Sequence, residues 1–181
     1  MQDPSFLTQA PEEKSWWRQL LNTLLPAITL VLTINLFLAQ PRIVHGQSME
    51  PSLHESQRVI IDLLSYRFRP PRRGEIIVLR ISPKAKQPPL IKRVIGLPGE
   101  LVAIHDGAVY INGHPLQEPY LAQNTPGQMP SRRVPPGHVF VLGDNRAHSN
   151  DSRYFGMVPM SQIIGRAWLC YWPPSAIGFF H

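Results

Sequence analysis

Twenty consecutive residues without a formal charge, Leu20 to Ala39, place the strongest limit on how this chain can fold. A helix of about twenty apolar residues crosses the ~30 Å hydrocarbon core of a membrane. Trp16 and Trp17 precede the run, where an interfacial aromatic belt would lie, and Lys14 and Arg18 flank it on the same side. We therefore expect a membrane-spanning anchor helix over residues 20–39.

The charges on the two sides of the run predict its orientation. Arg42 is the main basic residue that follows closely, so the excess of positive charge on the amino side is weak. It predicts a cytoplasmic segment over residues 1–19 and an extracytoplasmic domain over residues 40–181, on a periplasmic or lumenal face. A cleaved signal peptide is disfavoured because its apolar region is usually about 7–15 residues long. Polar residues within the run, such as Asn22, keep a buried helix of a soluble protein as an alternative.

Composition limits the partners of the domain. Roughly 140 residues remain after the anchor, enough for one sizeable core. The formal net charge of +6 suits an anionic membrane surface or nucleic acid. The basic residues are scattered and lack regular aromatic neighbours, so we expect contact with membrane lipid and not with nucleic acid. The single cysteine, Cys170, excludes an intramolecular disulfide and is predicted to be a buried apolar side chain. Nothing in the composition requires an oligomer.

The domain is predicted to be mainly β. Short apolar runs bounded by Gly, Pro or Asn predict strands over residues 59–64, 75–81, 90–95, 138–142 and 163–171. Asp106-Gly107 lies between two further runs, 101–105 and 108–111, and predicts a two-residue hairpin turn. The aromatic C-terminal tail is predicted either to form a last strand on the core or to enter a membrane interface.

Lys92 lies within the predicted strand 90–95. Side chains alternate along a strand, so Lys92 shares a face with Leu90 and Val94 while Arg93 points the other way. A free lysine is protonated at neutral pH, whereas burial can lower its pKa by roughly 3–5 units. A buried Lys92 would therefore be a general base. A lysine whose ammonium reaches water is the plainer alternative.

Ser48 and a polar loop are the other candidates for chemistry. Ser48 lies nine positions after Ala39, a reach of at most ~30 Å, so the serine lies close to the membrane face. The loop Gly143–Arg153 lacks the Gly and Glu that a calcium-binding EF-hand needs at its sixth and twelfth positions. It is either a solvated turn region or a hydrogen-bonded network beside a site.

Taken together, these segments resemble the type I signal peptidases, the membrane-anchored enzymes that remove signal peptides from exported proteins. Four motifs in order after the anchor carry the resemblance, which extends to about Trp172. They are Gln47-Ser48-Met49-Glu50-Pro51-Ser52-Leu53, Arg73-Gly74-Glu75-Ile76-Ile77-Val78-Leu79, Lys92-Arg93-Val94-Ile95-Gly96-Leu97-Pro98-Gly99-Glu100, and Gly143-Asp144-Asn145-Arg146 with Ser149 and Asp151-Ser152-Arg153.

The resemblance implies the family's coiled antiparallel β-sheet domain on an N-terminal transmembrane helix. It makes Ser48 the nucleophile and Lys92 the general base of a Ser-Lys dyad that needs no cofactor or metal. It implies that Ser149 hydrogen-bonds and orients the Lys92 amine, and that Asp144, Asp151 and Arg153 support the site. The implied substrate-binding residues, which accept small side chains before the cut in signal-peptide-bearing preproteins, are Val44, Met49, Leu53 and Ile91.

One departure and several alternatives remain. Family members often carry a hydroxyl residue where this chain has Gly46, so the set of oxyanion donors is open. A serine hydrolase based on His45, His54 or His148 is one alternative, and a self-cleaving Ser-Lys peptidase is another. A third, from a different class, is a membrane-anchored β-rich binding module or degenerate peptidase.

Overall fold

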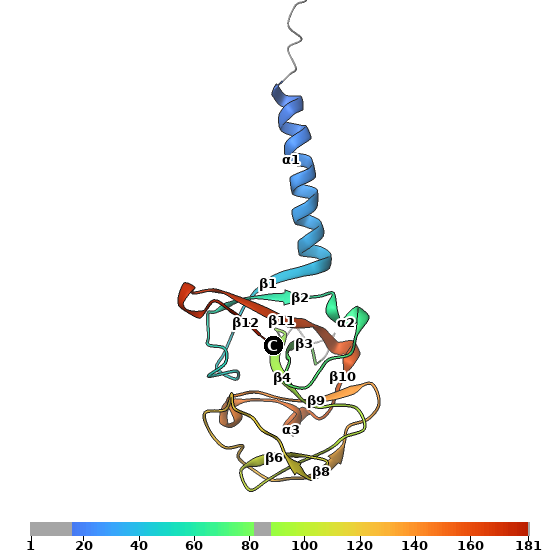
Figure 1. Ribbon diagram of the computed structural model, residues 1–181, viewed down its shortest axis with the longest axis vertical. Helices are drawn as coiled ribbons and strands as arrows, with labels where there is room; N and C mark the ends of the chain where they lie inside the picture. The colour runs from blue at the N-terminus through green and yellow to red at the C-terminus, as the bar shows by residue number, and fades with distance from the viewer. Residues whose placement is uncertain (1–15, 82–87, 181) are drawn as a thin grey trace, which may run out of the picture.

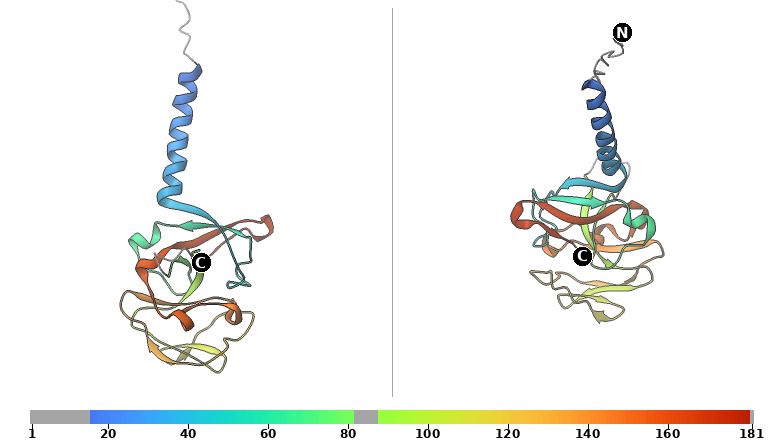
Figure 2. Two further views of the ribbon diagram at one scale, coloured as in Figure 1. Left: turned by 180° about the vertical axis from the view of Figure 1, so that it is seen from behind. Right: turned by 45° about the horizontal axis from the view of Figure 1, so that its top comes forward.

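The N-terminal helix stands apart from a β-rich domain. The computed structural model describes residues 16–81 and 88–180, apart from the side chains of residues 35 and 36. Helix α1 (Trp16–Thr33) projects from the domain, and the π-helical turn η1 (Ile34–Leu38) joins it to the first strand (Figure 1). The views in Figure 2 show the same separation, and no residue of α1 is buried. Within the described ranges, no helix combines the length and the apolar character that crossing a bilayer requires.

The helix does not have the predicted bounds. It begins before Leu20, and Ala39 is already the first residue of strand β1 (Ala39–Ile43). The apolar composition continues from α1 through η1, so it gave no signal that α1 ends at Thr33. Pro41 is tolerated in β1 because the strand lies at the edge of its sheet, where the missing N–H of proline removes no hydrogen bond between strands.

Two antiparallel sheets form the domain, as the predicted mainly β class requires. The larger sheet has the order β1-β2-β11-β3-β4-β9-β10, and β12 pairs with β11. Its strands are β1, β2 (Arg58–Asp62), β3 (Ile76–Leu79), β4 (Leu90–Gly96), β9 (His138–Leu142), β10 (Val158–Pro159), β11 (Ile163–Trp172) and β12 (Gly178–Phe179). The smaller sheet has the order β7-β6-β5-β8, with β5 (Leu101–His105), β6 (Ala108–Ile111), β7 (His114–Pro115) and β8 (Met129–Arg133). The short helices are α2 (Ser65–Phe68), η2 (Arg146–His148), α3 (Ser152–Phe155), η3 (Met160–Gln162) and η4 (Pro174–Ala176).

The predicted strands and the hairpin are confirmed. Each predicted apolar run contains a strand, with ends that differ by at most two residues. Asp106 and Gly107 both have positive φ, as a tight hairpin turn between β5 and β6 needs. The C-terminal tail forms the last strand β12, and Cys170 is buried. Strands β1, β7, β8 and β10 were not predicted because they are very short or rich in polar residues and proline.

Three apolar clusters fill the domain. The first lies beneath β2 and β11 and includes Val44, Met49 and Leu53 from the segment around Ser48. The second joins the two sheets, and the third lies between β3, β4 and β9. Gly96 ends β4 where the chain passes to the small sheet, and a Cβ there would come within 2.6 Å of Val102 Cγ2. Strand β4 is thereby held in contact with all three clusters, and it carries Lys92.

Candidate active site

Ser48 lies in a short turn that the core holds in place. The turn closes through the bonds from Glu50 N to Gln47 O (3.2 Å) and from Leu53 N to Met49 O (2.9 Å). Met49 and Leu53 are fully buried in the first cluster, so the turn is fixed from below. The Ser48 carbonyl accepts a hydrogen bond from Asn145 N at 3.1 Å. This backbone contact joins the serine turn to the polar loop, although the two are far apart in the sequence.

Lys92 reaches Ser48 from a central strand. Strand β4 is paired on both sides, with β3 and with β9, and the Lys92 side chain is 2% exposed. Its Nζ lies 2.8 Å from Ser48 Oγ and 2.9 Å from Ile91 O. Burial lowers the pKa of Lys92 to about 8, although the charges of Asp151 and Asp144 act in the opposite direction. The amine is thus dry, close to the hydroxyl and much easier to deprotonate than a free lysine.

The polar loop is a buried network and not a solvated turn. Asp151 is fully buried, accepts a hydrogen bond from Gly143 N (3.1 Å) and pairs with Arg153, whose Nε lies 2.8 Å from Oδ1. Ser152 Oγ accepts a hydrogen bond from Val141 N at 3.0 Å, which ties the loop to β9. The predicted Asp151–Arg153 pair is therefore present. It fixes the loop that carries Asn145.

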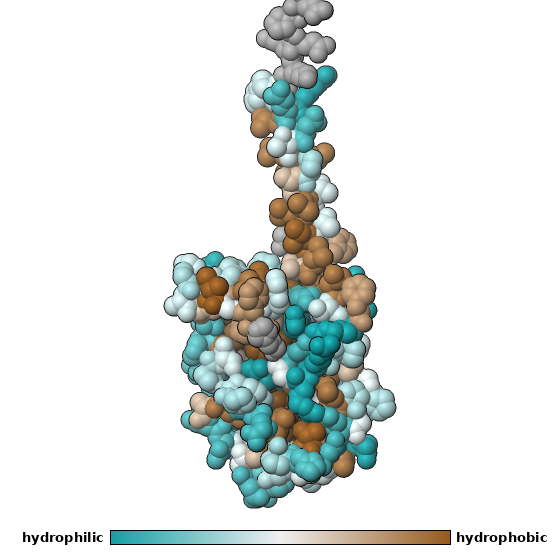
Figure 3. Space-filling view, in the orientation of Figure 1, coloured by the Kyte–Doolittle hydropathy of each residue, from teal (hydrophilic) through white to brown (hydrophobic). Residues whose placement is uncertain are grey.

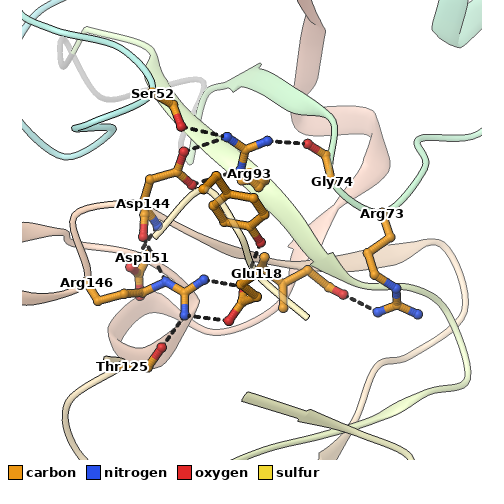
Figure 4. A network of polar contacts seen from close by, with 12 residues as sticks. Ser52, Arg73, Gly74, Arg93, Glu118, Thr125, Asp144, Arg146 and Asp151 are labelled. Carbon is orange, nitrogen blue, oxygen red and sulfur yellow. Dashed lines mark hydrogen bonds and ion pairs between the residues drawn. The ribbon is translucent and has the colours of Figure 1, made fainter. Parts of the chain in front are cut away.

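Asp144 supports the site through Arg93 and not through Lys92. Arg93 Nε and Nη2 donate to the two Asp144 carboxylate oxygens at 2.9 Å and 2.6 Å (Figure 4). The same guanidinium donates to Ser52 Oγ at 3.0 Å and to Gly74 O at 2.7 Å. As the alternation along β4 predicts, Arg93 leaves the Lys92 face, but it is buried and paired. One arginine therefore connects the serine turn, β4 and the polar loop.

The predicted hydrogen bond between Ser149 and Lys92 is absent. Within the described chain no hydrogen-bond partner reaches Ser149 Oγ, which is buried. Lys92 instead donates to Ser48 Oγ and Ile91 O, and these two contacts fix the direction of the amine. Ser149 lies beside Gly143, where an added Cβ would collide with Ser149 Oγ and with Ser48 O. The hydroxyl is thus next to the site but does not orient the lysine in this structure.

A groove is lined by Ile91, the chain neighbour of Lys92 and one of the four predicted substrate-binding residues. The groove encloses about 590 Å³. Its lining comes from the part of the larger sheet between β1 and β4 and includes Ile43, His45, Val78, Pro89, Ile91 and Tyr171. Val44, Met49 and Leu53 pack inside the first core cluster instead, each at most 1% exposed. These apolar side chains were predicted to line a substrate pocket. They pack in the core instead and hold the turn that carries Ser48.

The histidines that would support a Ser-His hydrolase lie elsewhere. His54 Nδ1 is 3.6 Å from Glu50 Oε1, and His148 Nδ1 is 3.2 Å from Asn145 Oδ1. All three candidate histidines are exposed, and in the part of the chain that the structure describes none is hydrogen-bonded to Ser48. The basic group beside the Ser48 hydroxyl is Lys92.

The comparisons with known proteins agree with this geometry. A family model described as signal peptidase, peptidase S26, matches residues 17–172. The chain belongs to this family. Curated signal peptidases are similar to the chain in sequence. It is 40% identical over 174 residues to a probable signal peptidase I-2 of Synechocystis sp., covering 94% of this chain and 79% of that protein. It is 44% identical over 158 residues to the signal peptidase I of Leptolyngbya laminosa, covering 84% of this chain and 78% of that one.

A solved signal peptidase structure also matches. The crystal structure of a signal peptidase I from Enterococcus faecalis is 40% identical in sequence and has a TM-score of 0.48. The match covers 54% of this chain and 97% of that one.

Two residues beside the candidate site, Glu118 and Tyr120, were not found from the sequence. Arg146, Glu118 and Tyr120 form a second buried network beside the Arg93–Asp144 pair. Arg146 lies inside a recognised motif, but Glu118 and Tyr120 lie in a polar segment with turn-forming residues on both sides. The sequence could indicate only that a buried arginine in the polar loop needs an acidic partner. Nothing in the sequence indicates which acidic residue that partner is.

Proposed function

We propose that this serine endopeptidase of the signal peptidase family removes signal peptides through a Ser48–Lys92 dyad. Neutral Lys92 accepts the Ser48 proton as the hydroxyl oxygen attacks the scissile carbonyl. The protonated lysine then gives that proton to the leaving amine of the mature protein. Lys92 next takes a proton from a water molecule, whose oxygen attacks the acyl carbon, and it then returns this proton to Ser48 Oγ as the bond between Oγ and the acyl group breaks. These steps use only the two side chains and water.

The observation that carries the proposal is the 2.8 Å contact between Lys92 Nζ and Ser48 Oγ at a lysine that is 2% exposed. A general base must lie within hydrogen-bond reach of the proton it takes, and it works best with a pKa near the operating pH. Lys92 meets the first condition directly. Its lowered pKa of about 8 meets the second.

The oxyanion would be held by main-chain groups. Gly46 carries no side chain that could donate, and its N–H lies 3.4 Å from Glu55 Oε1. Among the residues described, no acceptor takes the Ser48 N–H. We infer that this N–H is the first donor to the developing oxyanion, which a preorganised site stabilises strongly.

The precursor would bind in the groove as an extended strand. Strand β1 is the edge of the larger sheet, so its outer backbone groups can pair with an added peptide. The groove runs from β1 to the first residues of β4, and Ile91 lies beside Lys92. Side chains that point into the sheet would meet Ile91 and the buried first cluster, which leaves room for small residues only. The proposal therefore predicts cleavage after small side chains.

We further propose that α1 and η1 attach the enzyme to a membrane. Their exposed apolar side chains include Leu21, Leu25, Leu30 and Phe37, and Figure 3 shows apolar surface along the part of the helix nearer the domain. The hydroxyl groups of three helix threonines bond to carbonyls one turn earlier, so they need no water. No described helix by itself has the length and apolar character of a membrane span, so we propose that α1 and η1 act as one continuous segment, with residues 1–19 on the cytoplasmic side and the groove beside the opposite membrane surface.

Cleavage of a detergent-solubilised preprotein tests the proposal. The native chain is expected to release the mature protein, whereas Ser48→Ala and Lys92→Ala are expected to be folded and to lose activity by more than ~10³-fold. Ser131→Ala, an exposed serine on β8, is the matched control and is expected to be fully active. Near-normal cleavage by Lys92→Ala would reject the dyad. A native chain that binds precursor without cutting it would instead support a binding module.

A further inference from the structure

A segment of the smaller sheet reaches the loop that holds Ser48. Residues 116–128 connect β7 to β8, in the half of the domain far from α1 (Figure 1). Thr125 is fully buried, and its N–H donates to Gly107 O at 2.8 Å, which fixes the segment to the hairpin turn of the smaller sheet. The side chains of Glu118 and Tyr120 project from this segment toward the two arginines beside the site.

Glu118 holds Arg146 in a buried ion pair. The side chains of Glu118 and Arg146 are 6% and 1% exposed. Both guanidinium nitrogens Nη1 and Nη2 donate to the carboxylate, and Nη1 also donates to Thr125 Oγ1 (Figure 4). The third nitrogen, Nε, donates to Gly143 O at 3.0 Å. Arg146 thus uses all three guanidinium nitrogens to join the 116–128 segment to the first residue of the polar loop.

Tyr120 covers the other arginine. The Arg93 guanidinium lies over the Tyr120 ring, with its carbon 3.9 Å from the ring centroid. The Tyr120 hydroxyl donates to Glu118 Oε1 at 2.6 Å. The aromatic face excludes water from Arg93, and the hydroxyl connects this stack to the Glu118–Arg146 pair. One short segment therefore contacts both arginines.

The two arginines hold adjacent residues at the start of the stretch Gly143–Arg146. Arg93 binds Asp144, and Arg146 binds Gly143 O. The next residue, Asn145, donates its N–H to the Ser48 carbonyl at 3.1 Å, and a Cβ at Gly143 would collide with the same carbonyl oxygen. A displacement of this stretch moves the main chain of Ser48. The same Arg93 follows Lys92 directly on β4.

We propose that Glu118 and Tyr120 are positioning residues that set the distance between Ser48 Oγ and Lys92 Nζ through Arg146 and Arg93. The smaller sheet then acts on catalysis from outside the groove, without touching substrate. This inference rests on the proposed Ser48–Lys92 dyad. It means that the contacts of Glu118 and Tyr120 with the two arginines affect the rate of cleavage.

The test measures preprotein cleavage by the full chain in detergent. Glu118→Gln keeps the side-chain shape but removes the charge that pairs with Arg146. It is expected to lower kcat roughly ten- to hundred-fold, since a small misplacement of reacting groups costs this much, with KM within about threefold of native. Glu100→Gln is the matched control. It breaks an ion pair with Arg73 that is more exposed and does not contact residues 143–146, and its kcat is expected to stay within twofold of native.

Three further measurements separate positioning from a general loss of structure. The kcat of each variant is calculated from the concentration of active enzyme, which is measured as the fraction of enzyme molecules that form acyl-enzyme in the burst phase. The double variant Glu118→Gln/Arg146→Gln is expected to have a kcat no lower than that of Arg146→Gln alone, because Glu118 acts through Arg146. Tyr120→Leu, which removes the ring over Arg93, is expected to lower kcat at least fivefold. If Glu118→Gln does not fold, the kcat of Tyr120→Leu decides whether the 116–128 segment positions the dyad.

An equal loss of kcat in Glu118→Gln and Glu100→Gln would overturn the inference, as would multiplicative losses in the double variant. A loss confined to KM would also overturn it, since that result would place the 116–128 segment in substrate binding. Failure of the dyad is distinguished independently, because it would appear as cleavage by Ser48→Ala or Lys92→Ala.

Discussion

Replacing Lys92 by methionine should change how the stability of the protein depends on pH. The pKa of Lys92 is lowered by burial from 10.5 to about 8. Between these values the unfolded chain binds a proton that the folded chain does not, so the free energy of unfolding of the native protein rises with pH by about 1.4 kcal/mol per unit. Over the whole interval, 10.5 minus 8, the gain is about 3 kcal/mol. Below pH 8 the native protein lacks this contribution.

The methionine variant has no amine to desolvate, but it loses two hydrogen bonds, to Ser48 Oγ and Ile91 O. Each is worth about 1 kcal/mol. At pH 7 the variant should therefore be more stable than the native protein by about 1 kcal/mol. At pH 10.5 it should be less stable by about 2 kcal/mol. The two stability curves are expected to cross.

Urea unfolding followed by tryptophan fluorescence, at pH 7, 8.5 and 10.5 in one detergent, gives both curves. Ser48→Ala is the control, because burial and not the serine is the main cause of the lowered pKa, and it should keep the native pH dependence. Parallel curves for the native protein and Lys92→Met would refute the reasoning, since they would mean that Lys92 titrates alike in the folded and unfolded chains.

Three more predictions concern the site. The rate of precursor cleavage should rise with pH through an acidic limb near 8, where Lys92 loses its proton; a limb near 10 in the pH–rate profile would count against a desolvated base. Asp151→Asn should lower the free energy of unfolding by about 3 kcal/mol in urea titrations, because it leaves Arg153 without its buried partner. The same change should move the acidic limb to lower pH, because the Asp151 charge raises the pKa of Lys92, and an upward shift would contradict this. Gly143→Ala should reduce kcat at least ~100-fold, because its Cβ would displace the Ser48 carbonyl, and native kcat in a folded variant would show that the turn tolerates the displacement.

The sequence predicted those parts of the fold that depend on local patterns. Strands β5 and β6 were predicted correctly to the residue because Asp106-Gly107 fixes their turn and a short apolar run lies on each side of it. Strand β1 was missed because it is short and contains Gln40, Pro41 and Arg42, which do not form the apolar pattern of a strand. Pro41 is consistent with the end of a helix, but it does not indicate that a strand follows.

The dyad was predicted because its two residues lie in recognisable motifs, and the supporting contacts were predicted less well. Ser149 was expected to bind Lys92, yet the lysine is held by Ile91 O, a backbone group that no side-chain motif can reveal. Leu53 was expected to line a pocket, yet it is fully buried below the serine turn. Glu118 escaped notice because its importance depends on where the smaller sheet packs, and that contact joins segments far apart in the chain.

Titration of the Lys92 amine itself tests the central claim most directly. The chain has four lysines, so protein labelled with ¹³C at the lysine ε-carbon gives few signals, and Lys92→Met identifies the one that belongs to the site. One ε-carbon that titrates near pH 8 and disappears in the variant is the predicted result. If the signal lost in Lys92→Met titrates near 10, the amine is solvated, and the Ser48–Lys92 mechanism is contradicted.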